Sequence, residues 1–489
     1  MNAPTLRPYQ VEDLAFHIAN PKSLNTSDPG TGKTPTVCVL AWYHWARRQK
    51  KTVWAMPLSL RDKNKEELLR FTGFKSEDVV ILTSDHAALT EDWTGPTFTR
   101  NKRVRRPTGR IGPDGEPETK MVDEPIVAKD LIAAAKEAKV FIVTFAFLSS
   151  HWRRLLATIP DIDLFLVDEL HLGYGGPASA QTESFYFVNR HVNNFCGMTG
   201  TLIDGRLDSA FPAIHVIEPR YYGGYGGFLD EHSLWTNNYG KVEVWKGEEK
   251  LKQILARHSV QHTFTEVYGD EPVHFETVTG PMGPIQREEY DKFHEQAMLE
   301  LEDGRILDGS MPGVALIRAT QIMGHPETYL LAKGEILWKD KKLMEYATEG
   351  RPMLVFSAAV AEQERCQRVL QDQGLRAGLI NNTVSGPKRS AIDAAFRAGE
   401  LDAIVASGPT AGIGWNWERA DHVINVSVDY KDVNFLQAYR RASRGTRTSV
   451  LRVTTLEYEN SIDRRKFDIL TAKSVIANKV DPNRKVLAF

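Results

Sequence analysis

The chain has 489 residues, of which 42% are hydrophobic and 25% are charged, and its formal net charge at pH 7 is -2. This length suits about two to four domains, and the composition excludes a small disulfide scaffold, a disordered chain and a fibrous repeat. The near-zero charge shows no global signature of polyanion binding, so any nucleic-acid contact must come from local basic patches.

Cysteine usage and hydropathy restrict the class of protein further. Cys38, Cys196 and Cys366 are widely spaced and fit neither a disulfide framework nor paired zinc ligands, which indicates a reducing compartment. The sequence shows no targeting pattern and no apolar run long enough to span a bilayer. We therefore expect a monomer without membrane contact, cytoplasmic in location and nucleoid-associated if the source is bacterial or viral.

Two series of short apolar runs predict an α/β fold with two parallel-sheet lobes. The first series comprises Lys51 to Met56, Val140 to Phe145 and Leu164 to Val167. The second comprises Met353 to Phe356, Ala377 to Ile380, Ala403 to Ala406 and His422 to Val426. Runs rich in β-branched residues that alternate with helical patterns are typical of parallel sheets. We expect a first lobe over residues 1–217 and a second over residues 334–489.

Residues 218–333, between the two lobes, show a different pattern. Charged helical patterns, such as Gly247 to His258 and Gln286 to Leu301, replace the rhythm of strands. The sequence therefore predicts a mainly helical insertion. Within the second lobe, one helix carries both end signals, since Ser385 can cap it and Gly399 can end it. Its apolar residues Ile392 and Phe396 share a face that should pack on the sheet.

A basic segment interrupts the first lobe at residues 94–125. Gly and Pro are frequent there, and six basic residues have no acidic neighbour: Arg100, Lys102, Arg103, Arg105, Arg106 and Arg110. These features predict a long loop. Two interpretations are open: the arginines, with Arg103, Arg105 and Arg106 at the centre, bind nucleic-acid phosphates, or the segment is a solvated, disordered insert.

A phosphate-binding loop is predicted near the start of the chain. Ser27 to Thr34 reads SDPGTGKT, and its glycines would let backbone amides curl around phosphate oxygens before a helix begins. Lys33 would reach the β and γ phosphates, and the Thr34 hydroxyl would bind Mg²⁺. The predicted nucleotide-binding residues are Ser27, Gly30, Thr31, Gly32, Lys33 and Thr34. A coincidental Gly-rich turn is the alternative.

Two adjacent carboxylates strengthen this prediction. The apolar run from Ile162 to Val167 ends in Asp168-Glu169-Leu170-His171, and the carboxyl ends of parallel strands are where ligands bind. Asp168 would contribute to the Mg²⁺ shell, and Glu169 would orient or deprotonate the attacking water. A solvated turn after a buried strand is the alternative, which the accompanying phosphate loop disfavours.

In their order and spacing, these motifs resemble helicase superfamily two, and within it the SWI/SNF-like translocase branch. Leu6 to Gln10 is similar to the opening signature of that branch, in which Gln10 would read adenine with its amide. Met198 to Thr201 resembles the motif that couples two RecA-like lobes. Phe211 to Tyr222 and Ile317 to Pro326 resemble two segments specific to the branch, so the resemblance covers nearly the whole chain.

The second lobe shows the remaining motifs of this family. Ala406 to Asn416 resembles motif five, in which Gly412 and Gly414 allow close backbone approach, Gly414 to the nucleotide. Gln437 to Gly445 resembles motif six, whose arginines neutralise charge on the transferred phosphoryl group. The resemblance implies catalytic roles for Gln437, Arg441 and Arg444, while Arg440 leaves open which two arginines insert.

The resemblance also implies nucleic-acid contacts from loops that follow the strands. Small hydroxyls and amides there can bond phosphates, and the implied residues are Pro57, Ser59, Thr144, Ser357, Thr410 and Asn416. From chemistry alone, Ser59 could instead end a strand and Thr144 could sit in the sheet. Trp415 and Trp417 are interpreted as core anchors.

The sequence departs from the family pattern at three places. Asp28-Pro29 replaces an acidic-methionine pair, Asn64 stands where tryptophan is common, and Leu170 replaces a small residue. None of them removes a catalytic group.

The resemblance implies an ATPase that uses Mg²⁺ and moves along nucleic acid. Duplex or branched DNA is the expected partner, with remodelling of protein–DNA complexes or branched DNA, as in recombination or repair, as the expected task. The alternatives are a strand-separating DNA or RNA helicase, the motor subunit of a restriction or defence assembly, and an ATP-gated clamp that does not hydrolyse ATP.

Overall fold

The computed structural model describes residues 4–83, 93–111, 117–174, 176, 179–203, 205–238, 240, 242–301, 305–408, 415–429, 438–443 and 447–480. The chain divides into two compact units, Met1–Leu24 with Thr34–Met198, and Asn25–Lys33 with Thr199–Phe489. The short phosphate-loop segment therefore clusters with the second unit. The predicted lobe boundaries at residues 217 and 333 remain predictions.

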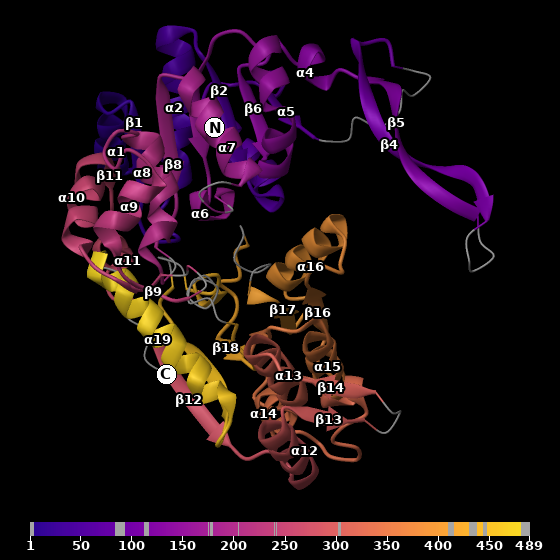
Figure 1. Ribbon diagram of the computed structural model, residues 1–489. Helices are drawn as coiled ribbons and strands as arrows, with labels where there is room; N and C mark the ends of the chain where they lie inside the picture. Colours follow the sequence, from indigo (N-terminus) through magenta and orange to yellow (C-terminus); the bar gives the residue numbers. More distant parts are fainter. Residues whose placement is uncertain are drawn as a thin grey trace. The chain divides into compact units, whose positions relative to one another are not determined.

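The first unit is built on a parallel sheet (Figure 1). Its strands are β1 (Lys22–Asn25), β2 (Lys51–Met56), β3 (Val79–Leu82), β6 (Val140–Thr144), β7 (Ile162–Val167) and β8 (Asn194–Met198). They lie in the order β1-β8-β7-β2-β6-β3, with β11 (Ser259–Val260) next to β1. The pairs β7·β8, β2·β7, β2·β6 and β3·β6 are all parallel. Burial of β2 and β7 along nearly their whole length explains their continuous apolar sequences.

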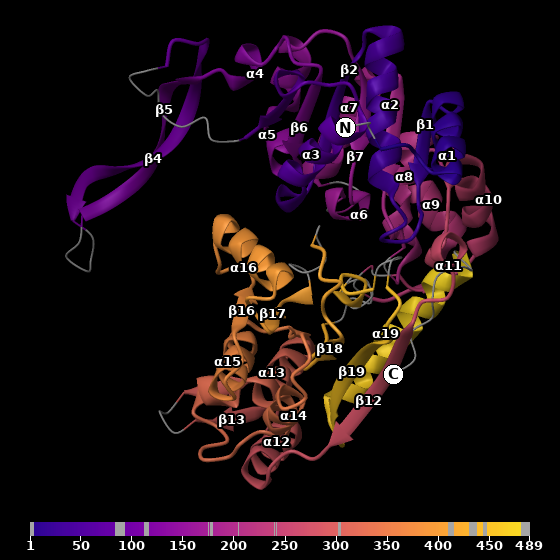
Figure 2. The same ribbon diagram turned by 180° about the vertical axis from the view of Figure 1, so that it is seen from behind.

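Helices cover this sheet, and Figure 2 shows β6, β2 and β7 side by side between α5 and α2. The helices of this part of the chain are α1 (Pro8–Ala19), α2 (Lys33–Arg48), α3 (Arg61–Phe71), α4 (Leu131–Ala134), α5 (Phe145–Thr158), α6 (Leu170–Gly173) and α7 (Ala180–His191). Short turns η1 (Leu58–Leu60) and η2 (Ser76–Asp78) follow β2 and precede β3. Within the described parts of the chain, no helix combines the length and apolarity needed to cross a membrane.

The basic segment is a β-ribbon, which corrects the prediction of a loop over residues 94–125. Strands β4 (Thr97–Ile111) and β5 (Pro117–Lys129) pair antiparallel, and the ribbon begins beside α4 (Figure 1). The acids lie on the second strand of the ribbon, where Glu124 forms an ion pair with Arg106 of the first strand. Cross-strand pairing of opposite charges stabilises such a ribbon despite its prolines.

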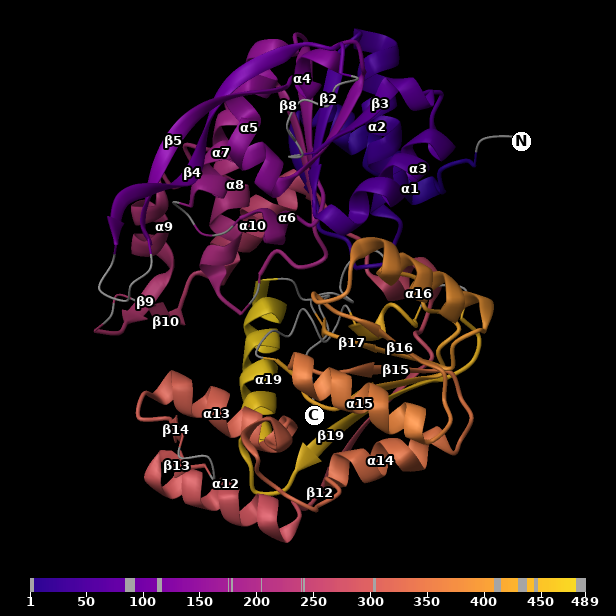
Figure 3. The same ribbon diagram turned by 90° about the vertical axis from the view of Figure 1, so that its right-hand side faces the viewer.

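The second unit contains a parallel sheet of six strands (Figure 3). These are β12 (Val273–Gly280), β15 (Met353–Phe356), β16 (Ala377–Ile380), β17 (Ala403–Ala406), β18 (His422–Asn425) and β19 (Leu451–Tyr458), in the order β12-β19-β18-β15-β17-β16. Every neighbouring pair is parallel. The chain therefore has the predicted α/β architecture with two parallel sheets.

Alternate residues of β15 show that helices cover both faces of this sheet. Met353 and Val355 belong to a core that includes residues of α14 (Trp338–Ala347) and α15 (Val360–Asp372). Leu354 and Phe356 belong to a second core with residues of α16 (Gly386–Ala398) and α19 (Ile462–Val480). Side chains alternate along a strand, so a strand buried on both faces needs apolar residues at every position.

The helix predicted from residue 385 is α16, and Gly399 ends it with a φ of 82°. Phe396 is buried, and Ile392 packs against the same core, as their shared face predicts. Ser385 takes the N-cap position but makes no side-chain capping hydrogen bond.

Residues 218–333, predicted as a mainly helical insertion, contain helices together with several short strands. Helices and turns near and within this range are η3 (Leu207–Ala210), α8 (Phe211–Ile217), α9 (Tyr225–His232), α10 (Glu248–His258), α11 (Phe264–Tyr268), α12 (Pro284–Gln296), α13 (Pro312–Gly324) and η4 (Pro326–Tyr329). Two hairpins, β9 (Ser233–Thr236) with β10 (Val242–Trp245) and β13 (Met298–Glu300) with β14 (Ile306–Asp308), also lie here. Strand β12 completes the edge of the second sheet beside β19.

Candidate nucleotide site and nucleic-acid interface

The predicted phosphate loop has the backbone shape that its glycines allow. Gly30 and Gly32 have φ values of 89° and 87°, a region that favours glycine, and α2 begins at Lys33. The Lys33 ammonium donates to the carbonyl oxygens of Ser27 and Asp28, at 2.7 and 2.9 Å. The Thr31 hydroxyl donates to the same Asp28 carbonyl at 2.8 Å. Ser27, Gly30, Thr31, Gly32 and Lys33 thus form one compact loop.

A segment of the second unit, residues 260–268, holds this loop. The backbone N–H of Asp28 donates to the His262 carbonyl at 2.9 Å, and the N–H of His262 donates to Ser27 Oγ at 3.0 Å. The N–H of Phe264 donates to Asp28 Oδ2 at 3.0 Å, and the Tyr268 hydroxyl donates to the Gly30 carbonyl at 3.2 Å. We call residues 260–268 the clasp, since these hydrogen bonds join them to the loop.

Arg440, whose role the sequence left open, contacts the same loop. Its guanidinium lies 3.1 Å from Asp28 Oδ2 and 5.6 Å from the ring centre of Phe264, and its Nε donates to the Tyr439 hydroxyl at 3.3 Å. Burial opposes the charge of Arg440, but Tyr439, Asp28 and Glu271 outweigh it and raise the pKa of this group. Arg440 is therefore a cation that anchors the phosphate loop through Asp28.

The other predicted residues of motif six are only partly described. Arg441 is 8% exposed, and its carbonyl oxygen accepts the N–H of Trp417 at 2.9 Å. Gln437, Arg444, Gly414 and Thr410 lie outside the residues that the structure describes.

The two predicted acidic residues stand where β7 ends. Asp168 is 8% exposed, and its Oδ1 accepts the N–H of Glu169 at 2.9 Å. Glu169 has a φ of 48°, an uncommon left-handed conformation for a non-glycine residue. Its carboxylate lies 3.6 Å from His171 Nδ1. Such a conformation costs about 1–2 kcal/mol. The two adjacent carboxylates have different partners, since Asp168 accepts from Asn64 whereas Glu169 lies beside His171.

Asn64 joins this group, although the sequence shows it only as a departure from the family. It lies in α3, is 2% exposed, and its amide nitrogen donates to Asp168 Oδ2 at 2.8 Å. The same nitrogen lies 3.5 Å from Met56 Sδ. Both oxygens of the Asp168 carboxylate therefore accept a hydrogen bond from the protein.

Two glycines explain the other departures. A Cβ on Gly197 of β8 would lie 2.9 Å from Leu170 Cδ2, so the glycine makes room for the large residue that replaces a small one. A Cβ on Gly200 would lie 2.6 Å from Pro29 Cδ, so Gly200 accommodates the proline of the phosphate loop. Real Cβ atoms do not approach other atoms this closely. In each pair, the glycine therefore leaves the space that its larger neighbour fills.

Gln10, the predicted adenine contact, lies in α1 and is 5% exposed. Its Oε1 accepts the backbone N–H of Arg7 at 2.8 Å. This bond fixes the side chain at the start of the helix, and adenine recognition by Gln10 remains a prediction.

The predicted nucleic-acid contacts of the first unit lie after two neighbouring strands. After β2, Pro57 precedes η1 and the exposed Ser59 lies within it. Thr144 ends β6, where its register partner is Met56 of β2. The Thr144 hydroxyl caps α5 by accepting the N–H of Phe147 at 3.1 Å. Since both strands run parallel, these residues share one edge of the sheet.

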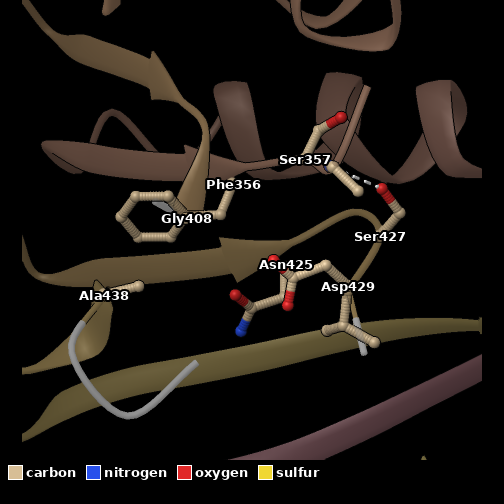
Figure 4. Close-up of a pocket in the computed structure, with 9 residues that line it drawn as sticks. Phe356, Ser357, Gly408, Asn425, Ser427, Asp429 and Ala438 are labelled. Atoms are coloured by element: carbon tan, nitrogen blue, oxygen red, sulfur yellow. Dashed lines mark hydrogen bonds between the residues drawn. The ribbon is translucent and has the colours of Figure 1, made fainter. Parts of the chain in front are cut away.

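The carboxyl edge of the second sheet carries a small pocket (Figure 4), lined by residues that include Phe356, Ser357, Gly408, Asn425, Ser427 and Asp429. Ser357, a predicted nucleic-acid contact, is 1% exposed, and its hydroxyl donates to Glu362 at 2.5 Å. Ser427 bonds the same carboxylate. A phosphate contact by the Ser357 hydroxyl would therefore require that its bond to Glu362 break.

At the segment that resembles motif five, the predicted nucleic-acid contact and the tryptophans differ in burial. Asn416 is exposed, whereas Trp417 is fully buried and its indole N–H donates to Asp393 at 3.0 Å. Trp415 stacks on Trp417 at a centroid distance of 6.0 Å. The interpretation of both as core anchors is confirmed for Trp417, and Trp415 packs against the same core.

On the ribbon, Arg103, Arg105 and Arg106 are exposed. Arg106 makes a two-pronged ion pair with Glu124, at 2.5 and 2.7 Å, whereas Arg105 stands opposite Met121. Antiparallel pairing puts Arg103 and Arg105 on one face, two residues apart.

The side chains available suit a bound Mg²⁺–nucleotide. The Thr34 hydroxyl and the Asp168 carboxylate are oxygen donors of the kind that this hard cation prefers. Asp168 accepts two hydrogen bonds, and Glu169 follows it with a left-handed backbone. The buried strand β7 is therefore followed by two adjacent carboxylates. The residues therefore fit the group that the sequence predicts.

Comparisons with known proteins agree with these motifs. Residues 338–446 match the helicase conserved C-terminal domain. A Xenopus tropicalis protein named chromodomain-helicase-DNA-binding protein 8 is 22% identical over 311 residues, covering 56% of this chain and 14% of that protein. A Bacillus subtilis protein named uncharacterized ATP-dependent helicase YqhH is 19% identical over 358 residues, covering 67% of this chain and 61% of that protein.

A solved structure agrees with the fold. Dbp5 of S. cerevisiae, bound to RNA and ADP BeF3, has a TM-score of 0.53 and 11% identity, over 96% of this chain and 88% of that one. At this identity the likeness concerns the fold alone, which is that of two α/β lobes. The chain spans less than two thirds of both curated relatives above.

Proposed function

We propose that this chain, which belongs to the SWI/SNF-like branch of helicase superfamily two, is an ATP-driven motor that translocates along duplex DNA. The observation that carries the proposal is that the chain has both a phosphate loop and an acidic strand end, Asp168-Glu169, whose two carboxylates have different partners. Remodelling of protein–DNA complexes or of branched DNA is the task we assign to this motor. The relatives with DNA binding in their names support DNA as the track.

The chemistry that we assign to ATP hydrolysis follows from the side chains. Lys33 would neutralise the β and γ phosphates, and Glu169 would accept the proton of the attacking water while orienting it. Arg441 and Arg444 would neutralise charge on the transferred phosphoryl group. A bound Mg²⁺, held by Thr34 and Asp168, supplies positive charge to the phosphate oxygens. Arg440 is reserved for the phosphate loop by its ion pair with Asp28.

Movement along DNA would follow from alternating grip. ATP binding that favours one arrangement of the lobes, and hydrolysis that releases it, would shift contacts along a strand. The exposed loop at Ser59, the Thr144 cap and the ribbon arginines offer polar groups for phosphates. These contacts would not distinguish one base from another, which suits a motor that must move over any sequence.

The experiment that tests the proposal measures ATP hydrolysis with single-stranded DNA, duplex DNA, branched DNA and RNA. We expect the greatest stimulation by duplex or branched DNA. Stimulation by RNA alone would overturn the DNA assignment. The variants Lys33→Ala and Glu169→Gln should lose ATP turnover while remaining folded, and full activity in either purified variant would refute the site assignment.

A second candidate function is strand separation. The ribbon of β4 and β5 favours it, because two strands paired over 11 consecutive residues, Thr97–Pro107, could part a duplex as a wedge. At about 3.3 Å per residue, the stretch Thr97–Pro107 measures about 33 Å. Displacement of a triplex strand without duplex unwinding would favour translocation, whereas efficient unwinding that is lost on shortening the ribbon would favour the helicase.

A further inference from the structure

We propose that Asn64 is a positioning residue for Mg²⁺, acting through its hydrogen bond to Asp168. This inference rests on the proposed function, because it concerns the same ATP site. Asn64 would not touch the cation. It would instead hold the carboxylate of Asp168 in the orientation in which that group binds the cation. Replacement of Asn64 should therefore raise the Mg²⁺ concentration that nucleotide binding requires.

The geometry at Asp168 carries this proposal. The amide nitrogen of Asn64 donates to Oδ2 at 2.8 Å, and the N–H of Glu169 donates to Oδ1 at 2.9 Å. With a donor on each oxygen, the carboxylate plane cannot rotate freely. Partners that orient a ligating carboxylate in this way are part of the design of metal sites.

The chemistry of the Asn64 side chain suits this role. An amide is a neutral donor, so it fixes the carboxylate without cancelling the negative charge that attracts a cation. An arginine or lysine in this place would compete with Mg²⁺ for the same oxygens. Asn64 is also 2% exposed and lies 3.5 Å from Met56 Sδ at the end of β2, so its donor is directed by packing.

An ordinary buried asparagine–aspartate pair would look similar, and the first unit contains one for comparison. Asn194 is 6% exposed, and its amide nitrogen donates to Asp163 Oδ2 at 2.7 Å. Asn193 donates to the other oxygen of Asp163 at 2.6 Å. Asn194 begins β8 and Asp163 lies near the start of β7, at the opposite end of the strands from Asp168. This pair therefore has the same hydrogen bonds but no predicted ligand.

The test compares Asn64→Leu with Asn194→Leu. Binding of fluorescently labelled ADP is titrated with Mg²⁺ in each purified full-length variant, and measured again in EDTA. We expect Asn64→Leu to need about 10–100-fold more Mg²⁺ for half-maximal binding. Its affinity in EDTA should equal that of the unmodified chain. Asn194→Leu should keep the unmodified Mg²⁺ dependence although it loses a similar buried bond.

A normal Mg²⁺ dependence in Asn64→Leu, or an equal shift in Asn194→Leu, would overturn the inference. Asn64→Ala serves as the second variant if the leucine prevents folding, because it removes volume next to the carboxylate rather than adding an apolar group. The same shift is expected for it. Failure of the proposed function is distinguishable, since the unmodified chain would then bind no labelled ADP at any Mg²⁺ concentration.

Discussion

The ribbon of β4 and β5 makes a quantitative prediction about the salt dependence of DNA binding. Each phosphate that a cation neutralises contributes about -0.9 to the slope of log affinity against log salt. Arg103 and Arg105 are exposed on one face of the ribbon. The double variant Arg103→Gln/Arg105→Gln should therefore have a slope shallower by about 1.8. Between about 50 and 200 mM salt, its loss of affinity should be about tenfold smaller than that of the unmodified chain.

Arg106 should behave differently because Glu124 already neutralises it. Their ion pair is two-pronged, at 2.5 and 2.7 Å, so Arg106 has little charge left for a phosphate. The variant Glu124→Gln should steepen the slope by about 0.9 as it releases Arg106. Removing both partners together should leave the slope unchanged, since a neutral pair is lost.

Fluorescence anisotropy with a labelled duplex over a series of salt concentrations measures these slopes. Arg47→Gln/Arg48→Gln is the matched control, because those side chains are exposed in the last turn of α2, outside the ribbon. The reasoning would be refuted if the slope of Arg103→Gln/Arg105→Gln equalled that of the unmodified chain. The ribbon would then be a solvated arm without phosphate contacts.

Three further predictions concern other parts of the chain. Arg440→Gln should raise the KM for ATP with little change in kcat in steady-state assays, because it frees Asp28 of the phosphate loop rather than removing a group that acts on the phosphoryl. A large fall in kcat would instead make Arg440 catalytic. Burial lowers the pKa of His422 from 6.5 to about 4, so the unfolded state binds its proton first as the pH falls. The contribution of His422 to the free energy of unfolding is fully present above pH 6.5, and about 3 kcal/mol of it should be lost on acidification to pH 4. In urea denaturation, His422→Gln should show a flatter dependence of the unfolding free energy on pH. Trp417→Phe removes the indole donor to Asp393 and should lower the unfolding free energy by about 2 kcal/mol, whereas an unchanged urea midpoint would contradict its role as an anchor.

Much of the fold could be predicted because its determinants are local. The run Met353 to Phe356 is apolar at every position, and both faces of β15 are in fact covered by helices. Gly399 ends α16 with the positive φ that its lack of a side chain permits. In the same way, the glycines of the phosphate loop have the left-handed backbone that their spacing predicts. Local sequence determines such features directly.

Features that depend on pairing between distant residues could not be predicted. The sequence predicts a loop in place of the ribbon, because the acids that balance its arginines lie on the second strand, where Glu124 forms an ion pair with Arg106. The bond from Asn64 to Asp168 spans 104 positions of the sequence. Asn64 was visible only as an unusual residue, without a partner to explain it. Departures from a family pattern at a buried position are the signal that could have drawn attention to it.

The grouping of Asn25–Lys33 with the second compact unit limits how this chain can be divided. Expression of residues from Thr199 onward would leave His262 and Phe264 without the phosphate-loop groups that their backbone N–H groups bond. A fragment that ends at Met198 would carry the loop but not the clasp. Neither half is expected to reproduce the intact loop alone, whereas the two fragments mixed together could restore it. The chain is thus a candidate for a split enzyme whose nucleotide binding reports that the halves have met.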